Sequence, residues 1–150
     1  MINLNIKAYH ILTKLFLKDF VKKDYGRILN VASMAGFVTG PYMATYYATK
    51  SYIVNLSLAI SKELNQMNSN VKISIFCPDS VKTNFTKNAK VHVNIKSLTS
   101  KSAASMAITG LFKNKLIIIP SNMKINYLLT KISPLNIILK INSLIQERAS

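Results

Sequence analysis

The chain contains 150 residues, of which 49% are hydrophobic, and 20 basic against 5 acidic side chains give it a net charge of +15. This apolar content excludes a solvated, disordered polymer and indicates one packed unit of ordinary domain length. The single cysteine, Cys77, excludes an intramolecular disulfide and a cysteine-based metal cluster, so we expect a cytoplasmic protein without a metal site, in which this thiol is a buried, inert group.

The N-terminal region has the spacing of an amphipathic helix. Apolar residues recur at Leu4, Ala8, Ile11 and Leu15, with lysines on the other positions, which predicts a helix over residues 2–22. The lysines interrupt any signal-peptide core, and nowhere in the chain do about 18 consecutive apolar residues occur. We therefore expect no transmembrane segment.

Short aliphatic runs alternate with longer helical patterns through the rest of the chain. Strands are predicted at residues 27–32, 71–76 and 115–119, helices at 44–67 and 97–112, and two short helices in a tail at 122–147 that Pro134 divides. Helices that alternate with strands buried on both faces imply a parallel sheet with right-handed crossovers. The sequence therefore predicts an α/β fold with about three parallel strands and flanking helices.

Three side chains near the first predicted strand can transfer a proton at a carbonyl. Tyr46 and Lys50 are four residues apart and share one helix face, and Ser33 follows the strand thirteen residues before Tyr46. A free phenol has a pKa of about 10, and a nearby ammonium favours the phenolate, so we expect Lys50 to lower the pKa of Tyr46. Ser33 would hold the substrate oxygen while Tyr46 gives or takes the proton.

Each candidate also has a purely structural interpretation. Ser33 can be a turn hydroxyl that bonds its own backbone, and Lys50 a solvated surface charge. Asn5, a further candidate in the predicted N-terminal helix, can be a helix cap. The combination of Ser33, Tyr46 and Lys50 at this spacing favours the catalytic interpretation.

Three segments together resemble the short-chain dehydrogenase/reductase family, and they resemble its C-terminal half. Residues 26–36 read GRILNVASMAG, residues 46–50 read YYATK and residues 77–83 read CPDSVKT. The resemblance implies a partial Rossmann-like, doubly wound parallel sheet. It also implies an NAD(P)-dependent oxidoreductase that transfers hydride between a nicotinamide and a carbonyl or alcohol carbon.

The resemblance implies roles for individual residues. Ser33, Tyr46 and Lys50 match the family's catalytic set, and Asn5 matches by position the Asn that completes its proton relay to solvent. In the family the Lys also bonds the cofactor ribose, so Tyr46 and Lys50 are expected at the cofactor as well.

The segment after the second predicted strand matches the part of the family that lies against the nicotinamide. Pro78, Val81 and Thr83 match its cofactor contacts by position, and Asp79 stands where the family usually has glycine. Asp79 adds a side chain and a negative charge near the expected ring. By resemblance the cofactor is NAD or NADP.

The family's Gly-rich turn has no counterpart among these residues. The four glycines, Gly26, Gly36, Gly40 and Gly110, do not form a fingerprint between a strand and a helix that would bind a cofactor diphosphate. We therefore expect residues 1–150 to be one partial domain, the C-terminal portion of a family member, with a helical tail at 121–150. Such a truncated chain is expected to be inactive alone.

The expected substrate is a small-molecule carbonyl or alcohol. Residues 85–98 and 115–120 resemble those of family members associated with ketoacyl or steroid-like carbonyls. The apolar tail after Pro120 would suit a greasy substrate or contact with a membrane surface, or it closes the core or a subunit interface.

A non-catalytic remnant or interaction module is the main alternative. A fragment of this sheet leaves the strand edge at residues 27–33 unpaired, and an apolar edge of this kind binds partners or aggregates. The partner would be a second copy in a homo-oligomer or a complementing chain that supplies the Gly-rich half.

The charge distribution leaves a third function class open. Ten lysines and no acid lie between Asp79 and Glu147, which would attract nucleic acid, anionic lipid or a phosphate-bearing substrate. The lysines are spread singly and are not interleaved with aromatic residues, so biased residue usage is the favoured explanation and no specific nucleic acid is expected.

Overall fold

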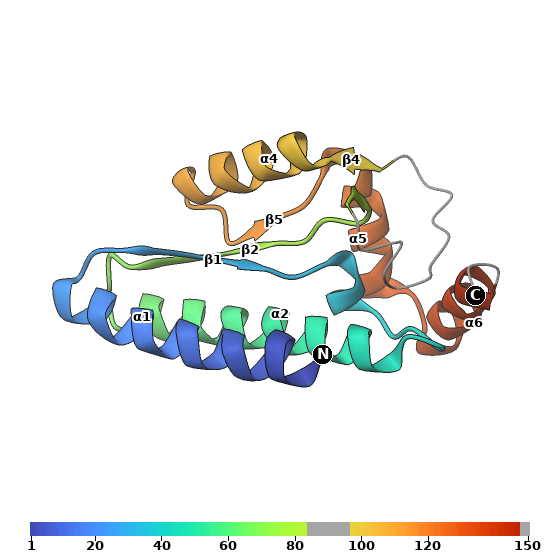
Figure 1. Cartoon of the computed structure of the whole chain (residues 1–150), viewed down its shortest axis with the longest axis horizontal. Coiled ribbons are helices and arrows are strands. Elements are labelled where there is room, and N and C mark those ends of the chain that lie inside the picture. Colours follow the sequence, from blue (N-terminus) through green and yellow to red (C-terminus); the bar gives the residue numbers. More distant parts are fainter. Residues whose placement is uncertain (84–96, 148–150) are drawn as a thin grey trace.

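A three-stranded parallel sheet lies between helices on both of its faces (Figure 1). The computed structural model describes residues 1–83 and 97–147. Helices α1 (Tyr9–Lys23) and α2 (Ala44–Gln66) cover one face of the sheet, and α4 (Ser100–Phe112) covers the other. This arrangement confirms the predicted α/β fold class.

The sheet has the strand order β1-β2-β5. Strands β1 (Arg27–Val31), β2 (Lys72–Phe76) and β5 (Ile117–Ile118) lie within the three predicted runs. Leu29 pairs with Ser74, and Ile75 pairs with Ile117. Strand β5 is shorter than its predicted run, because the chain turns at Pro120 into a 3-10 turn, η3 (Ser121–Met123).

Two short strands were not predicted from the sequence. Strands β3 (Val81–Lys82) and β4 (Leu98–Thr99) pair in parallel as a second, two-stranded sheet. Helix α4 therefore begins at Ser100, three residues later than predicted, because Thr99 is its N-cap and its Oγ1 accepts from Ser102 N at 3.2 Å.

The N-terminal helix is not uniform. Its first part, η1 (Asn3–Ala8), is a π-helix that continues into α1. The predicted single helix over residues 2–22 is therefore correct in extent but not in type, since apolar spacing does not distinguish a wider helical turn from an α-turn.

The tail forms two helices, α5 (Lys124–Ile132) and α6 (Leu135–Glu147), on either side of Pro134. They lie beyond the carboxyl ends of the strands (Figure 1). Across residues 1–83 and 97–147, no helix combines the length and the apolar character needed to cross a bilayer.

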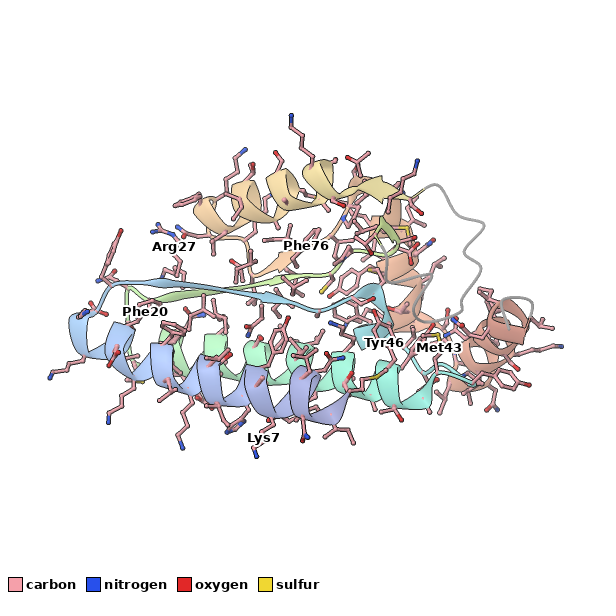
Figure 2. The ribbon with its side chains drawn as sticks, viewed as in Figure 1. Lys7, Phe20, Arg27, Met43, Tyr46 and Phe76 are labelled. Atoms are coloured by element: carbon pink, nitrogen blue, oxygen red, sulfur yellow. The ribbon has the colours of Figure 1, made fainter. Side chains whose placement is uncertain are left out.

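The core fills the space on both faces of the sheet. Toward α2 the fully buried residues Ile53 and Ile75 meet, and toward α4 Phe76 packs with Ala103 and Ala107 (Figure 2). Alternate residues of β2 thus point to opposite faces, as the strand pleat requires. Burial on both faces explains why successive residues of β2, from Ile73 to Phe76, are all buried.

A buried polar network joins β1 to the helices beneath it. Asn30 Nδ2 donates to Ser57 Oγ at 2.8 Å, and Ser57 Oγ donates to the Ile53 carbonyl at 2.8 Å. Thr13 Oγ1 lies 3.5 Å from Asn30 Oδ1. Because buried polar groups are costly unless they are bonded, this network fixes the register of α1 and α2 against β1.

Asp24 joins the end of α1 to the turn before β2. It has a left-handed backbone with φ 47°, and its carboxylate accepts from Asn70 N at 2.8 Å, Ser69 Oγ at 2.8 Å and Asn70 Nδ2 at 2.7 Å. These bonds, the Asn70 backbone N–H first, hold the pKa of Asp24 below its usual range.

We expect the melting temperature to fall more steeply in acid for the native chain than for Asp24→Asn. A lowered folded-state pKa gives a stabilisation that is present above the unfolded pKa, about 3.9, and is lost as the pH falls through the folded pKa. Asn keeps an oxygen acceptor and tolerates the left-handed backbone, so the variant removes mainly the charge. Melting curves between pH 2 and pH 6 test this.

The matched control is Asp19→Asn, which removes one charge from the surface of the same helix. Equal acid slopes for the native chain and Asp24→Asn, or an equal flattening by Asp19→Asn, would contradict the role given to Asp24.

Candidate active site

Ser33 lies where β1 ends and the chain turns into a 3-10 turn, η2 (Met34–Phe37). Its side chain is buried, and its Oγ accepts from Ala35 N at 3.1 Å. This bond to the backbone of its own turn is the one that the purely structural interpretation of Ser33 predicts. The same side chain also acts on the phenol of Tyr46, because its hydroxyl lowers the pKa of that phenol. A hydroxyl has one donor and two acceptor positions, so both contacts can form together.

Tyr46 and Lys50 occupy the first two turns of α2, close to the carboxyl end of β1 (Figure 2). Lys50 Nζ donates to the Val31 carbonyl at 3.3 Å and lies 5.9 Å from the centroid of the Tyr46 ring. Lys50 is therefore not the freely solvated charge of the structural interpretation. The fold brings Ser33, Tyr46 and Lys50 together at one end of the sheet.

The pKa of Tyr46 is shifted in the direction opposite to the expectation. Burial of the phenol raises its pKa, the Ser33 hydrogen bond lowers it, and the nearby charge of Asp79 raises it. Burial also lowers the pKa of Lys50. The expected lowering of the Tyr46 pKa was wrong because burial disfavours the charged forms of both Tyr46 and Lys50. This effect of burial outweighs the attraction between a phenolate and an ammonium one helical turn away.

Asn5 contacts the helix turn that carries the catalytic candidates. It lies inside η1, and its Nδ2 donates to Thr49 Oγ1 at 3.1 Å. Thr49 Oγ1 in turn donates to the Tyr46 carbonyl at 2.8 Å. The helix-cap interpretation of Asn5 was therefore wrong, since its side chain binds the neighbouring helix α2. Its partner there, Thr49, directly precedes Lys50 in the sequence.

Tyr9 lies in the candidate site, although the sequence pattern did not indicate it. Its hydroxyl donates to the Val31 carbonyl at 3.1 Å, the same acceptor that Lys50 uses, and Lys50 Nζ lies 5.9 Å from its ring centroid. The available signal was its position one helical turn after Asn5 on the same side of the helix. Burial raises the pKa of the Tyr9 phenol.

The segment after β2 lies at the same end of the sheet. Pro78 is buried, and its carbonyl accepts from Met34 N at 2.9 Å, which ties this segment to the turn after Ser33. Val81 is half-buried in β3, and Thr83 is exposed. Residues 85–96 of the predicted substrate loop lie outside the described residues.

Asp79 is half-buried close to the tyrosines of α2. Burial raises the pKa of its carboxyl group, and its charge raises the pKa of both Tyr46 and Tyr47. Asp79 therefore acts on the candidate site rather than pointing away from it.

Gly36 allows η2 to pack directly on α2. A Cβ at this position would lie 2.8 Å from the Lys50 backbone oxygen and 2.7 Å from Val54 Cγ2. Backbone atoms cannot move aside as a side chain can, so this contact requires glycine. It holds the turn after Ser33 against the helix that carries Tyr46 and Lys50.

Cys77 takes no part in this chemistry. It is fully buried at the end of β2, and burial raises the pKa of its thiol to about 12. The burial of Cys77 agrees with the expectation, and a thiol held in its neutral form is a poor nucleophile at neutral pH.

Together these residues form a candidate proton-transfer site. A phenol beside a hydroxyl, with an ammonium one turn away, lies where parallel strands end, the place where α/β sheets bind ligands. A carbonyl oxygen placed between Ser33 and Tyr46 would receive hydrogen bonds from both groups.

A family model described as short chain dehydrogenase matches residues 1–106. The chain is 30% identical over 132 residues to estradiol 17-beta-dehydrogenase 11 of Macaca fascicularis, which covers 87% of this chain and 44% of that protein. It is also 30% identical over 148 residues to 17-beta-hydroxysteroid dehydrogenase 13 of Homo sapiens, which covers 97% of this chain and 45% of that protein. The chain thus spans less than half the length of these relatives.

A solved structure of a short-chain dehydrogenase is also similar to this chain. A short-chain dehydrogenase from Sphingobium yanoikuyae in complex with NADPH superposes with a TM-score of 0.72 at 25% identity, covering 85% of this chain and 51% of that one.

We expect Asp79→Asn to lower the pKa of Tyr46, because the substitution removes a negative charge that opposes ionisation of the phenol. The same change should lower the pKa of Tyr47. NMR titration of tyrosines labelled with 13C at the ring carbon bearing the hydroxyl, with the two signals assigned from Tyr46→Phe and Tyr47→Phe, measures both values.

Glu63→Gln removes an acid from the exposed far end of α2 and should leave both pKa values unchanged. An unchanged pKa of Tyr46 in Asp79→Asn, or an equal fall in Glu63→Gln, would show that Asp79 does not act on the site.

Proposed function

This chain belongs to the short-chain dehydrogenase family, and on that premise we propose that it carries the catalytic portion of an NAD(P)-dependent oxidoreductase acting on a carbonyl or alcohol. The observation that supports this most directly is the grouping of three side chains at the end of β1. Ser33 follows the strand, and Lys50 Nζ lies 3.3 Å from the Val31 carbonyl and 5.9 Å from the centroid of the Tyr46 ring.

Tyr46 would be the acid-base group of this reaction. In reduction its hydroxyl gives a proton to the carbonyl oxygen, and Ser33 holds that oxygen through a second hydrogen bond. The raised pKa of Tyr46 keeps the phenol protonated at neutral pH, which suits the reductive direction. By its position Asn5 would take the place of the family's proton-relay Asn. Its bond to Thr49, which in turn donates to the Tyr46 backbone carbonyl, would hold it against the first turns of α2.

The residues at this end of the sheet fit the nicotinamide side of a cofactor. Lys50 presents a half-buried ammonium held by the Val31 carbonyl, a donor suited to ribose hydroxyls, and Tyr46 lies beside it. Pro78, Val81 and Thr83 follow β2 at the same end. A bound NAD or NADP would supply or accept the hydride.

Binding of the cofactor diphosphate and adenosine would come from outside these residues. Gly36, Gly40 and Gly110 are each close to a neighbouring side chain, Val54, Tyr47 and Ile118 respectively, so they serve packing. We propose that the chain is the C-terminal portion of a family member and that a Gly-rich segment completes it.

The substrate would be an apolar carbonyl compound. The matched relatives are named for estradiol and for 17-beta-hydroxysteroids, which are apolar alcohols of this class. Within residues 115–120, Leu116, Ile117 and Ile119 pack against the core, so this segment closes the fold rather than contacting substrate.

A second candidate function rests on the open edge of β1. The sheet order places β1 at an edge, where it pairs with β2 alone among the described strands. In a parallel ladder alternate residues bond the neighbour, so Arg27 and Leu29 direct their backbone groups toward the open side. The next such residue, Val31, already has its carbonyl bonded by Tyr9 and Lys50. A strand from a longer form of this protein or from a second chain would pair there.

We expect little or no carbonyl reduction by residues 1–150 alone, because the cofactor would be held only by its nicotinamide side. The loss of NADPH absorbance with estrone, the ketone that corresponds to estradiol, measures the reaction. Turnover by the isolated chain that disappears in Tyr46→Phe would contradict this expectation.

We expect activity to appear when the chain is joined to the residues of a matched relative that precede the matched region. In that fusion Tyr46→Phe should lower kcat/KM by about 100- to 10,000-fold, the usual contribution of a general acid or base. The adjacent Tyr47→Phe removes an equivalent hydroxyl that binds Gln146. Similar losses for the two variants would show that Tyr46 has no special role.

A further inference from the structure

The two C-terminal helices expose an apolar face to solvent. Nine large apolar side chains on them are between 49% and 78% exposed, namely Ile125, Leu128, Leu129 and Ile132 on α5 and Leu135, Ile137, Ile141, Leu144 and Ile145 on α6. The four on α5 share one side of that helix by their spacing, as do the last four on α6.

The opposite sides of both helices already hold them to the fold. Tyr127 of α5 packs edge-on against Phe37, with ring centroids 4.8 Å apart. On α6, Asn142 Nδ2 donates to the Thr39 carbonyl at 2.6 Å, and Gln146 Nε2 donates to Tyr47 Oη at 2.9 Å. The exposed apolar faces are therefore not needed to dock the helices, and an apolar surface of this extent indicates an interaction site.

The charge around these faces is positive. From residue 113 to residue 147 the chain has five lysines and one acid, Glu147. Lys124 and Lys140 are exposed on α5 and α6. Lys131 differs from them, since its Nζ lies 5.5 Å and 5.4 Å above the Phe37 and Tyr127 rings.

We propose that α5 and α6 dock on the surface of a bilayer that contains anionic phospholipid. Their apolar faces would enter the boundary between headgroups and acyl chains, and Lys124 and Lys140 would contact lipid phosphates. Amphipathic helices with aliphatic and basic side chains bind such interfaces through burial of apolar area together with electrostatic attraction. Nucleic acid would not use the isoleucines and leucines, and a neutral apolar partner would not use the lysines.

A strand that completes the sheet would pair with the backbone groups at the open side of β1. The two helices lie instead beyond the carboxyl ends of the strands (Figure 1), so their apolar faces are separate from that edge. This inference does not depend on catalysis by Tyr46 and can fail or hold independently of it.

Flotation of the full chain with vesicles on a density gradient tests the proposal, because aggregated protein does not float. We expect the chain to float with vesicles of phosphatidylcholine containing 30% phosphatidylserine, to float far less with phosphatidylcholine alone, and to lose binding as salt is raised.

Two double variants test separately the apolar and the electrostatic contribution to membrane binding. The variant Ile132→Ser/Ile141→Ser should weaken partitioning by roughly tenfold, because it removes apolar area that would be buried. The variant Lys124→Gln/Lys140→Gln should weaken it by about fivefold for each lysine. The matched controls are Leu12→Ser/Leu15→Ser and Lys14→Gln/Lys18→Gln. They alter another exposed apolar and basic helix surface, that of α1, and should change little when α5 and α6 carry the binding.

Three results would overturn the proposal. The first is an absence of flotation by the native chain with anionic vesicles, and the second is an equal loss in the α1 controls. The third is unchanged flotation of the α5–α6 variants combined with loss of self-association by sedimentation velocity, which would assign the apolar faces to a second copy of the chain.

Discussion

The close contact between the η2 turn and α2 is the constraint on which the rest of the site depends. Gly36 has no side chain, so the turn after β1 reaches the Lys50 backbone and the Val54 side chain. This contact fixes the distance between the end of a strand and the first turns of a helix. Ser33 then lies beside Tyr46, and Lys50 reaches the Val31 carbonyl at 3.3 Å.

Burial determines the electrostatics of that site. Removal from water raises the pKa of Tyr46 and Asp79 and lowers that of Lys50, so each group is shifted toward its neutral form. The protonated phenol that results is the form needed to donate to a carbonyl oxygen. Asp79 also favours the protonated phenol, because its nearby negative charge raises the pKa of both Tyr46 and Tyr47.

The open side of β1 and the outer faces of α5 and α6 are unpaired surfaces of different kinds, and they lie in different places. The open side of β1 offers backbone hydrogen-bonding groups, which only another strand can use in register. The outer faces of α5 and α6 offer aliphatic side chains beside lysines, which have no directional requirement. The open side of β1 would therefore bind only a partner with a strand in register. The faces of α5 and α6 would bind any partner that is apolar and negatively charged.

The sequence by itself determined the α/β class, the three strand positions and the grouping of Ser33, Tyr46 and Lys50, because these depend on local periodicity and on short spacings along the chain. Only the tertiary structure decided that Asn5 binds Thr49, that Tyr9 shares the Val31 carbonyl with Lys50, and that the pKa of Tyr46 is raised. The physical reason is that hydrogen-bond partners and burial come from segments distant in sequence, which no local pattern records.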